Sequence, residues 1–408
     1  MKIVKPSNLL TLTVLAVAVS GLVSCLNDPT PDPSQTTPVN QSGGTVDADY
    51  IGAYPSLAAA PDGRLHASYY AKFDWDVPGG GALRHAVLQS GVWTPEVVEG
   101  NVYDASVDVG QFTSIAVDAL GGLHIAYWDV TKKNLRYATL PAGAGAGGWQ
   151  IETVADLDAV CEDANLKLDA AGNVHIGYCN GTQVLVAVKS GGAWTHTPVA
   201  DLSGPDSRAK VSLEFDSGNL LHVAFFDPFT NQFKYTVGSP SAGSFPSPET
   251  VAAVVNNETR MDLTLDAAGN PHLVYYDITQ KTLMHAYKSG ATWQPVPSLI
   301  AEVGDVTSIS DGGSTSTGYL QLSSLMDHEG RLNVSYYQGT GASFGDQDLK
   351  LAVLRNSDWT VETIDTVDAG VDGADVGRTS AMAEDENGTI HIIYRDTTNN
   401  DLKYAYIQ

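Results

Sequence analysis

One short motif recurs seven times after residue 50, and this repeat constrains the fold more than any other feature. A clear copy reads Asp118-Ala-Leu-Gly-Gly-Leu-His124-Ile-Ala-Tyr-Trp-Asp129. The histidine column of the motif holds His66, His124, His175, His222, His272, Asn333 and His391. Successive copies therefore lie 47 to 61 residues apart. A period of this size is typical of architectures in which one supersecondary unit stacks on the next.

Each repeat unit contains four short segments with the alternation of β-strands. In the second copy the predicted strands are Phe112–Val117, Leu123–Trp128, Leu135–Thr139 and Trp149–Val154. Asp118 and Gly121 form the turn between the first two, because Asp accepts bonds from turn amides and Gly adopts a left-handed backbone. Seven such units can bury their faces only against one another. The sequence therefore predicts an all-β, seven-bladed β-propeller of four-stranded antiparallel blades.

The two ends of the repeat region predict how the ring closes. The last unit stops at Gln408, directly after its third strand, so it lacks a fourth strand of its own. Residues 45–50 are the only unassigned extended stretch ahead of the first unit. We expect this N-terminal segment to complete the last blade of a propeller domain that spans residues 46–408.

Two residue columns inside the repeat have structural interpretations. The fourth strand opens with an aromatic residue in six copies: Trp93, Trp149, Trp194, Phe245, Trp293 and Trp359. We interpret this column as packing between blades. Six of the ten histidines occupy the motif column, where equivalent positions lie far apart around a ring. We therefore predict hydrogen bonding by these histidines rather than metal binding.

The first 24 residues have the pattern of a signal peptide, with Lys2 and Lys5 ahead of an apolar run from Leu9 to Val23. The run ends in Leu22-Val23-Ser24-Cys25, which resembles the lipobox of bacterial lipoproteins. That resemblance implies cleavage before Cys25 and acylation of its sulfur; the alternative is an ordinary signal peptide with a chance cysteine. Residues 25–45 are rich in Pro, Thr and Ser and predict a flexible tether. We expect an exported protein anchored in a bacterial outer membrane, since Leu26 rather than Asp follows the cysteine.

The chain is strongly acidic, with 47 Asp and Glu against 22 Lys and Arg, a formal charge of −25. A nucleic-acid backbone would be repelled, so nucleic acid is excluded as a partner. We expect the protein to be monomeric. Besides the membrane that holds its anchor, its expected partner is a glycan or a protein ligand.

Cys161 and Cys179 are assigned to the first two strands of the third repeat. With the turn centred near Ala170 and Ala171, and Leu168 opposite Asn173, the pair lies within one residue of direct register. Outside the cytoplasm such a pair can form a disulfide; two buried thiols are the alternative.

Acidic residues gather in the loops between repeats, on the propeller face where the connections from second to third strands also emerge. One interpretation is solubility. The other is a Ca²⁺-assisted binding face built on Asp104, Asp108, Asp372 and Asp375, although neither stretch matches a complete calcium loop. The strand-end column adds four further carboxylates to this face: Asp129, Asp227, Asp277 and Asp396.

Two long connections on the same face carry exposed-loop aromatics. The first contains Asp74, Trp75 and Asp76, and the second, in the sixth repeat, contains Phe344. Aromatic rings beside carboxylates are suited to stacking a sugar or anchoring a protein. Packing of Trp75 over a neighbouring blade is the alternative.

The repeat, with the Asn/Asp-Leu-Lys-Tyr-Ala segment that follows it, resembles repeats of secreted and lipid-anchored bacterial propellers of the sialidase-like superfamily. The resemblance covers residues 50–408 and implies the fold. Sialidases are similar in using an arginine cluster, a Tyr/Glu pair, an acid Asp and Ser-x-Asp-x-Gly-x-Thr-Trp boxes, but no such box occurs here. Catalytic residues therefore do not transfer. We favour a non-catalytic binding propeller; the alternative is a glycan-active hydrolase or lyase using the same acidic face.

Overall fold

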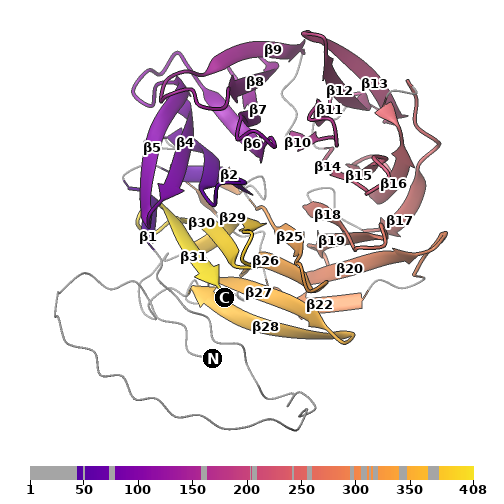
Figure 1. The fold of residues 1–408 in the computed structure, drawn as a ribbon. Helices are drawn as coiled ribbons and strands as arrows, with labels where there is room; N and C mark the ends of the chain where they lie inside the picture. The colour runs from indigo at the N-terminus through magenta and orange to yellow at the C-terminus, as the bar shows by residue number, and fades with distance from the viewer. Residues whose placement is uncertain are drawn as a thin grey trace, which may run out of the picture.

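The computed structural model describes residues 44–48, 51–72, 79–157, 163–202, 204, 209–240, 243–254, 260–294, 298–304, 310–311, 314–315, 320–339, 347–365 and 376–408. These residues form a seven-bladed β-propeller, as the repeat predicts (Figure 1). Within these ranges, no helix has the length and apolar character needed to cross a bilayer.

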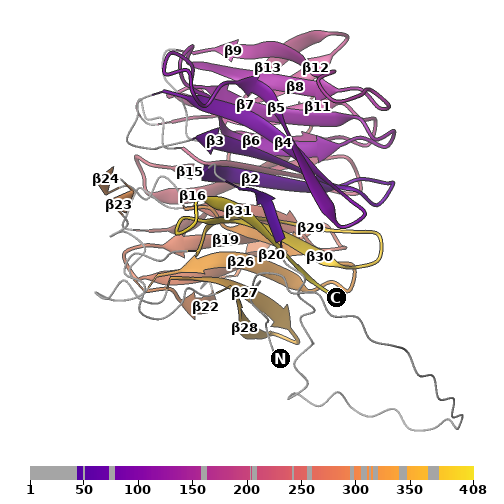
Figure 2. The same ribbon diagram turned by 90° about the vertical axis from the view of Figure 1, so that its left-hand side faces the viewer.

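Each blade is one antiparallel sheet whose strands follow one another outward from the centre of the ring (Figures 1 and 2). Blades 1 to 3 comprise β2 (Ile51–Ala59), β3 (Leu65–Lys72), β4 (Gly81–Gln89) and β5 (Val92–Gly100); β6 (Val109–Val117), β7 (Leu123–Asp129), β8 (Asn134–Leu140) and β9 (Gln150–Asp156); and β10 (Asn165–Leu168), β11 (Val174–Cys179), β12 (Gln183–Ser190) and β13 (Ala193–Asp201).

Blades 4 to 7 follow the same plan. They comprise β14 (Val211–Phe215), β15 (Leu221–Asp227), β16 (Gln232–Gly238) and β17 (Glu249–Ala253); β18 (Met261–Leu265), β19 (Pro271–Asp277), β20 (Thr282–Ser289) and an outer strand in two pieces, β21 (Thr292–Trp293) and β22 (Ser298–Glu302); β25 (Ser323–Met326), β26 (Leu332–Gln338), β27 (Asp348–Arg355) and β28 (Asp358–Asp365); and β29 (Val376–Glu384), β30 (Ile390–Asp396), β31 (Asp401–Ile407) and β1 (Gly44–Asp47). A small hairpin of β23 (Ser310–Asp311) and β24 (Ser314–Thr315) lies between blades 5 and 6.

The Asp-x-x-Gly turn has the predicted mechanism. In blade 2 the Asp118 carboxylate accepts bonds from the amides of Leu120 and Gly122, each at 2.8 Å. Gly121 has φ of +86°, where a side chain would be strained. Hydrogen bonds to the ionised form lower the pKa of Asp118, although burial opposes this shift. The ionised Asp118 side chain therefore fixes the turn that joins β6 to β7 by accepting hydrogen bonds from the turn amides.

The core lies between blades, and the aromatic column packs there as predicted. Each tryptophan packs edge-on against a third-strand ring of the preceding blade, at centroid distances of 5.3–5.5 Å. The pairs are Trp93–Tyr404, Trp149–His85, Trp194–Tyr137, Trp293–Tyr235 and Trp359–His285. The first of these pairs joins blade 1 to blade 7, so the same contact recurs across the closure of the ring.

The histidine column forms hydrogen bonds within each blade, as predicted. In blade 4, His222 Nδ1 accepts from the Tyr235 hydroxyl at 2.7 Å and Nε2 lies 3.4 Å from the Asp216 carboxylate of the turn. Two blades substitute a histidine for the tyrosine, giving the pairs His66–His85 and His272–His285 at 3.0 and 2.9 Å. Burial lowers the pKa of His66 to about 4 and that of His285 to about 3.

The N-terminal strand closes the ring, which confirms the expected completion of the last blade. β1 pairs antiparallel with β31 and forms the outer strand of blade 7. Asp47 at its end reaches into blade 1, where its carboxylate accepts from the Tyr69 hydroxyl at 2.6 Å and pairs with Arg84 at 3.0 Å. One buried aspartate thus links the first strand of the fold to both blades at the seam.

Candidate functional site at the central channel

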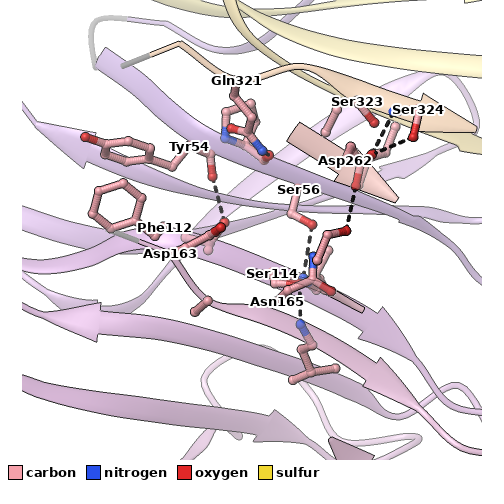
Figure 3. A pocket seen from close by; sticks show the side chains of 18 of the residues that line it. Tyr54, Ser56, Phe112, Ser114, Asp163, Asn165, Asp262, Gln321, Ser323 and Ser324 are labelled. Carbon is pink, nitrogen blue, oxygen red and sulfur yellow. Dashed lines mark hydrogen bonds between the residues drawn. The ribbon is translucent and has the colours of Figure 1, made fainter. Parts of the chain in front are cut away.

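A cavity of about 400 Å³ lies on the propeller axis. The inner strands of all seven blades contribute to its wall, with residues 54–58, 112–117, 163–168, 210–212, 214, 260–262, 264, 320–325 and 381–382. Concave sites of this size at the centre of a closed β architecture are suited to small ligands or parts of larger ones. We therefore take the channel as the candidate site (Figure 3).

Three repeat columns on the inner strands form successive tiers of the wall. The upper tier, next to the connections that enter from the preceding blade, holds Tyr54, Phe112, Asp163, Lys210, Arg260 and Gln321. The middle tier holds Ser56, Ser114, Asn165, Ser212, Asp262, Ser323 and Ala381. The lower tier holds Ala58, Ala116, Lys167, Glu214, Thr264 and Leu325. The tiers lie two residues apart because alternate strand residues share a face.

Middle-tier side chains bond neighbouring inner strands to one another. Each accepts a backbone N–H from the next blade, at six of the seven boundaries (Figure 3). The bonds are Ile115 N to Ser56 (3.1 Å), Leu166 N to Ser114 (2.9 Å), Leu213 N to Asn165 (3.2 Å), Leu263 N to Ser212 (3.1 Å), Ser324 N to Asp262 (2.7 Å) and Met382 N to Ser323 (3.2 Å). Blade 7 has Ala381 at this position and offers no such acceptor to blade 1. We call these six bonds the clip ring.

Two aromatic side chains of the upper tier sit on strained backbone. Tyr54 and Phe112 have φ of +50° and +53°, a region that bulky residues rarely occupy. Both lie at β-bulges, where the pairing of β2 with β3 and of β6 with β7 shifts. The centres of their rings are 4.3 Å apart, the two rings lie side by side (Figure 3), and Tyr54 also packs against Tyr70. Strain of this kind costs about 1–3 kcal/mol per residue and clusters at functional sites.

Charged side chains form the opposite part of the upper tier. Lys210 and Arg260 are buried, and the Lys210 ammonium lies 5.8 Å from the centre of the Phe112 ring. Asp163 occupies the same column in blade 3, next to the blade of Lys210, and its carboxylate accepts the Val211 amide at 2.9 Å. Burial raises the pKa of Asp163 although the two cations oppose this. A cationic pair, a carboxyl group and an aromatic pair thus share one cavity.

The middle and lower tiers carry a second charged group. Asp262 accepts from Ser212 Oγ at 3.0 Å and from the amide and hydroxyl of Ser324 at 2.7 and 3.1 Å. Burial raises the pKa of Asp262. Lys167 donates to Glu214 at 2.6 Å. These contacts join blades 3 to 6 across the channel wall.

The four predicted ligand residues all lie in connections outside the described part of the chain. Asp74, Trp75, Asp76 and Phe344 lie outside the described residues, so their contribution to a ligand site stays a prediction.

The same holds for half of the predicted calcium site, because Asp372 and Asp375 also lie outside the described residues. Asp104 and Asp108 are described. Asp104 accepts from the amide and hydroxyl of Ser106, at 3.0 and 2.6 Å. Asp108 accepts from the Tyr70 hydroxyl at 2.8 Å. Within the part of the chain that the structure describes, no three metal-ligating side chains converge.

Three of the four strand-end aspartates do not add to an exposed acidic face, whereas Asp277 is partly exposed. Asp129, Asp227 and Asp396 are fully buried or nearly so. Asp227 pairs with Lys234 at 2.7 Å, and Asp396 pairs with Lys403 at 2.6 Å. Each therefore holds the turn between second and third strands, because the third strand supplies a cation for it. The sequence pattern could not distinguish this internal pairing from surface charge.

The cysteine register differs from the predicted one by one residue. β10 pairs Leu168 with Val174 rather than with Asn173, and this register extended along the strands places Asp163 opposite Cys179. Cys179 is buried, and its Sγ accepts the Gly181 amide at 3.1 Å. Cys161 lies outside the described residues, so the disulfide stays a prediction.

Sequence reasoning missed the channel residues. A signal was present, because the position ten residues before each motif histidine holds Ser, Asn or Asp in six of the seven copies. Such a polar column on an otherwise apolar inner strand indicates side chains that bond a neighbouring strand. The upper tier carries no such signal, because its residue type changes from blade to blade.

No protein-family model matches the chain, and no curated protein matches it. Many solved structures share the fold. AofleA from Arthrobotrys oligospora is 13% identical, with a TM-score of 0.52, over 82% of this chain and 91% of that one. A PL25 polysaccharide lyase, an ulvan lyase, is 13% identical, with a TM-score of 0.54, over 90% and 96%. The NanB sialidase of Streptococcus pneumoniae is 14% identical, with a TM-score of 0.47, over 93% and 71%. At these identities the similarity shows the fold alone.

Proposed function

We propose that this protein is a glycan-binding propeller whose site is the upper tier of the channel. The observation that carries the proposal is the meeting, in one cavity, of the strained aromatic pair with two buried cations. Aromatic rings stack against the apolar face of a sugar, and fixed charges select its substituents. The strain at Tyr54 and Phe112 supports a functional role, since packing alone does not require bulky residues in this conformation.

The favoured ligand carries a carboxylate or sulfate group. Among the described residues, the upper tier contains the cations Lys210 and Arg260 and the carboxyl group of Asp163. Carboxylate and sulfate are the sugar substituents that lysine and arginine side chains bind through charge-assisted hydrogen bonds. The PL25 lyase with this fold was solved with a glycan of glucuronate and sulfated rhamnose, -[GlcA(1-4)Rha3S]-, which supplies a suitable acidic probe.

Isothermal titration with oligosaccharides of that repeat tests the proposal. We expect Lys210→Met and Arg260→Gln to weaken binding by at least about tenfold, because each removes a desolvated partner of the anion. Lys132→Gln is the matched control, since Lys132 is 61% exposed at the turn between β7 and β8. The control should bind like the parent protein, and thermal unfolding should verify that all three variants are folded.

A desulfated, carboxyl-reduced analogue separates the two parts of the proposal. Equal affinity for this neutral analogue would contradict the anionic ligand. If neither the acidic nor the neutral oligosaccharides bind, and a glycan array shows no other ligand, then glycan binding itself is wrong.

A second candidate function, a glycan-active hydrolase or lyase, is supported by Asp163. Its carboxyl faces the same cavity, and burial raises its pKa toward the range of a general acid. Release of reducing ends or unsaturated products from a bound glycan, abolished by Asp163→Asn with binding retained, would establish this function instead.

We also retain the proposal of a lipid anchor at Cys25 and export to the outer membrane, which rests on the lipobox resemblance and the signal-peptide pattern. A tether over residues 25–45 would then hold the channel away from the bilayer.

A further inference from the structure

The wall of the channel has no lateral opening among the described residues. Seven inner strands surround the cavity, and the clip ring bonds neighbouring strands at six boundaries. The clips occupy the middle of the wall, where a gap between blades would otherwise give access from the side. Opening any of these boundaries would leave a backbone N–H without its acceptor, at a cost of about 1–3 kcal/mol.

The seventh boundary is closed by other contacts. Leu57, Ala381 and Ala383 belong to one buried apolar cluster that joins blades 1 and 7. Gln321 bridges the same region from blade 6, because its side-chain amide donates to the Pro55 carbonyl at 3.2 Å and its backbone N–H donates to the Arg378 carbonyl at 2.9 Å. The seam therefore also excludes lateral entry.

The channel is deep relative to its volume. The upper and lower tiers are four residues apart on each regular strand, which corresponds to about 13 Å along the strand. A cavity of about 400 Å³ over this depth accommodates a short segment of a polymer rather than a long one. A ligand that reaches below the upper tier must therefore enter along the axis.

We propose that the channel receives the end of a glycan chain and not an internal segment of it. The inference rests on the proposed function and specifies which part of the glycan is recognised. An internal segment could lie only across the mouth, because a continuous chain cannot pass sideways through a closed ring of strands. A chain end can enter along the axis past the upper tier and continue toward the polar middle tier.

Binding capacity as a function of chain ends tests this proposal. The probe is a polymer of the GlcA(1-4)Rha3S repeat, compared at constant mass before and after partial random depolymerisation to known mean lengths. We expect the number of protein molecules bound per gram to rise in proportion to the number of chains. In titrations with single oligosaccharides of two, four and eight repeats, the stoichiometry should stay at one protein per chain. Product analysis during each titration verifies that no cleavage creates new ends.

The opposite result is capacity that follows mass and does not change on depolymerisation. It would overturn end recognition while leaving glycan binding in place. Loss of binding to every length would instead contradict the proposed function. Lys210→Met provides the second measurement: it should reduce the affinity for all lengths by the same factor, because each chain uses the same site once. A loss that grows with chain length would indicate multiple contacts along the chain and would also overturn end recognition.

Discussion

At the scale of single residues, the third-strand aromatic residue has two partners. Tyr235 donates to His222 of its own blade and packs against Trp293 of the next. In blade 5 the equivalent His285 forms a hydrogen bond with His272 at 2.9 Å and packs against Trp359. Blades 1, 2, 4, 5 and 7 therefore use tyrosine or histidine at one position for the same two contacts, whereas blades 3 and 6 have Val186 and Leu351 there. The two side chains differ in their response to pH, because only histidine titrates between pH 3 and 7.

We predict that His285→Tyr makes the stability less dependent on pH. The unfolded chain binds a proton at His285 below about pH 6.5, whereas burial lowers the pKa of the folded group to about 3. The unfolded state therefore holds more protons in this window, and stability falls as the pH falls from 6.5 toward 3. Removing one such group should reduce the slope by up to about 1.4 kcal/mol per pH unit.

Urea unfolding of both proteins at several pH values between 4 and 7 measures this slope. Tyr287→Phe is a suitable control, since it alters a neighbouring ring of the same strand without removing a titrating imidazole. Parallel slopes for His285→Tyr and the parent would show that the histidine is already charged in the folded state.

At the scale of strands, the clip ring fixes the inner strands to one another. Its acceptors are mostly serines, and only blade 7, with Ala381, departs from the pattern. The channel wall is thus held by polar bonds in its middle and by apolar packing between blades farther out.

We predict that Ser114→Ala destabilises the propeller by about 1–3 kcal/mol, because the buried Leu166 amide loses its acceptor. The reciprocal change, Ala381→Ser, supplies the seventh acceptor and should stabilise by about 0.5–1.5 kcal/mol. Denaturant unfolding measures both. A destabilising Ala381→Ser would mean that the small side chain is required for packing at the seam, and the clip would then not be transferable between blades.

The strands were predictable because they repeat, and the site was not. For blade 2 the predicted strands lie within three residues of the observed ones, since the alternation and the Asp118 turn recur in every copy. The upper tier has the opposite property. Tyr54, Phe112, Lys210 and Arg260 occupy one column but share no residue type. Comparing the repeat copies cannot reveal a functional column whose residue differs in every copy. A single site on the axis of a ring nevertheless requires such differences, because each blade contributes a different side chain to it.

At the scale of the whole molecule, the ring closes through the strand that directly follows the predicted tether. Truncation tests how much this strand contributes. A chain that begins at residue 44 should unfold like one that retains the tether. A chain that begins at residue 52 loses β1 and the Asp47 contacts to Tyr69 and Arg84. It should unfold at a temperature at least several degrees lower, as measured by calorimetry, and equal midpoints would show that β1 does not secure the ring.

The proposed anchor gives a separate prediction. Cys25→Ser removes the sulfur that would be acylated, and we expect the variant to leave the membrane fraction, because no other acyl site is predicted. The measurement is fractionation followed by detection of the propeller in soluble and membrane pools. A variant that stays with the membranes would show that another element holds it there.

The pairing of β1 with β31 also sets an order of events during synthesis. Residues 44–47 are made before the other strands of the propeller, and their partner at residues 401–407 is made after the strands between them. The ring therefore cannot close until β31 has been made, and contacts of such long range form slowly. A chain crossing a membrane through a narrow pore must stay unfolded until it has passed. Because β1 has no partner until β31 has been made, the propeller stays open and can still be translocated.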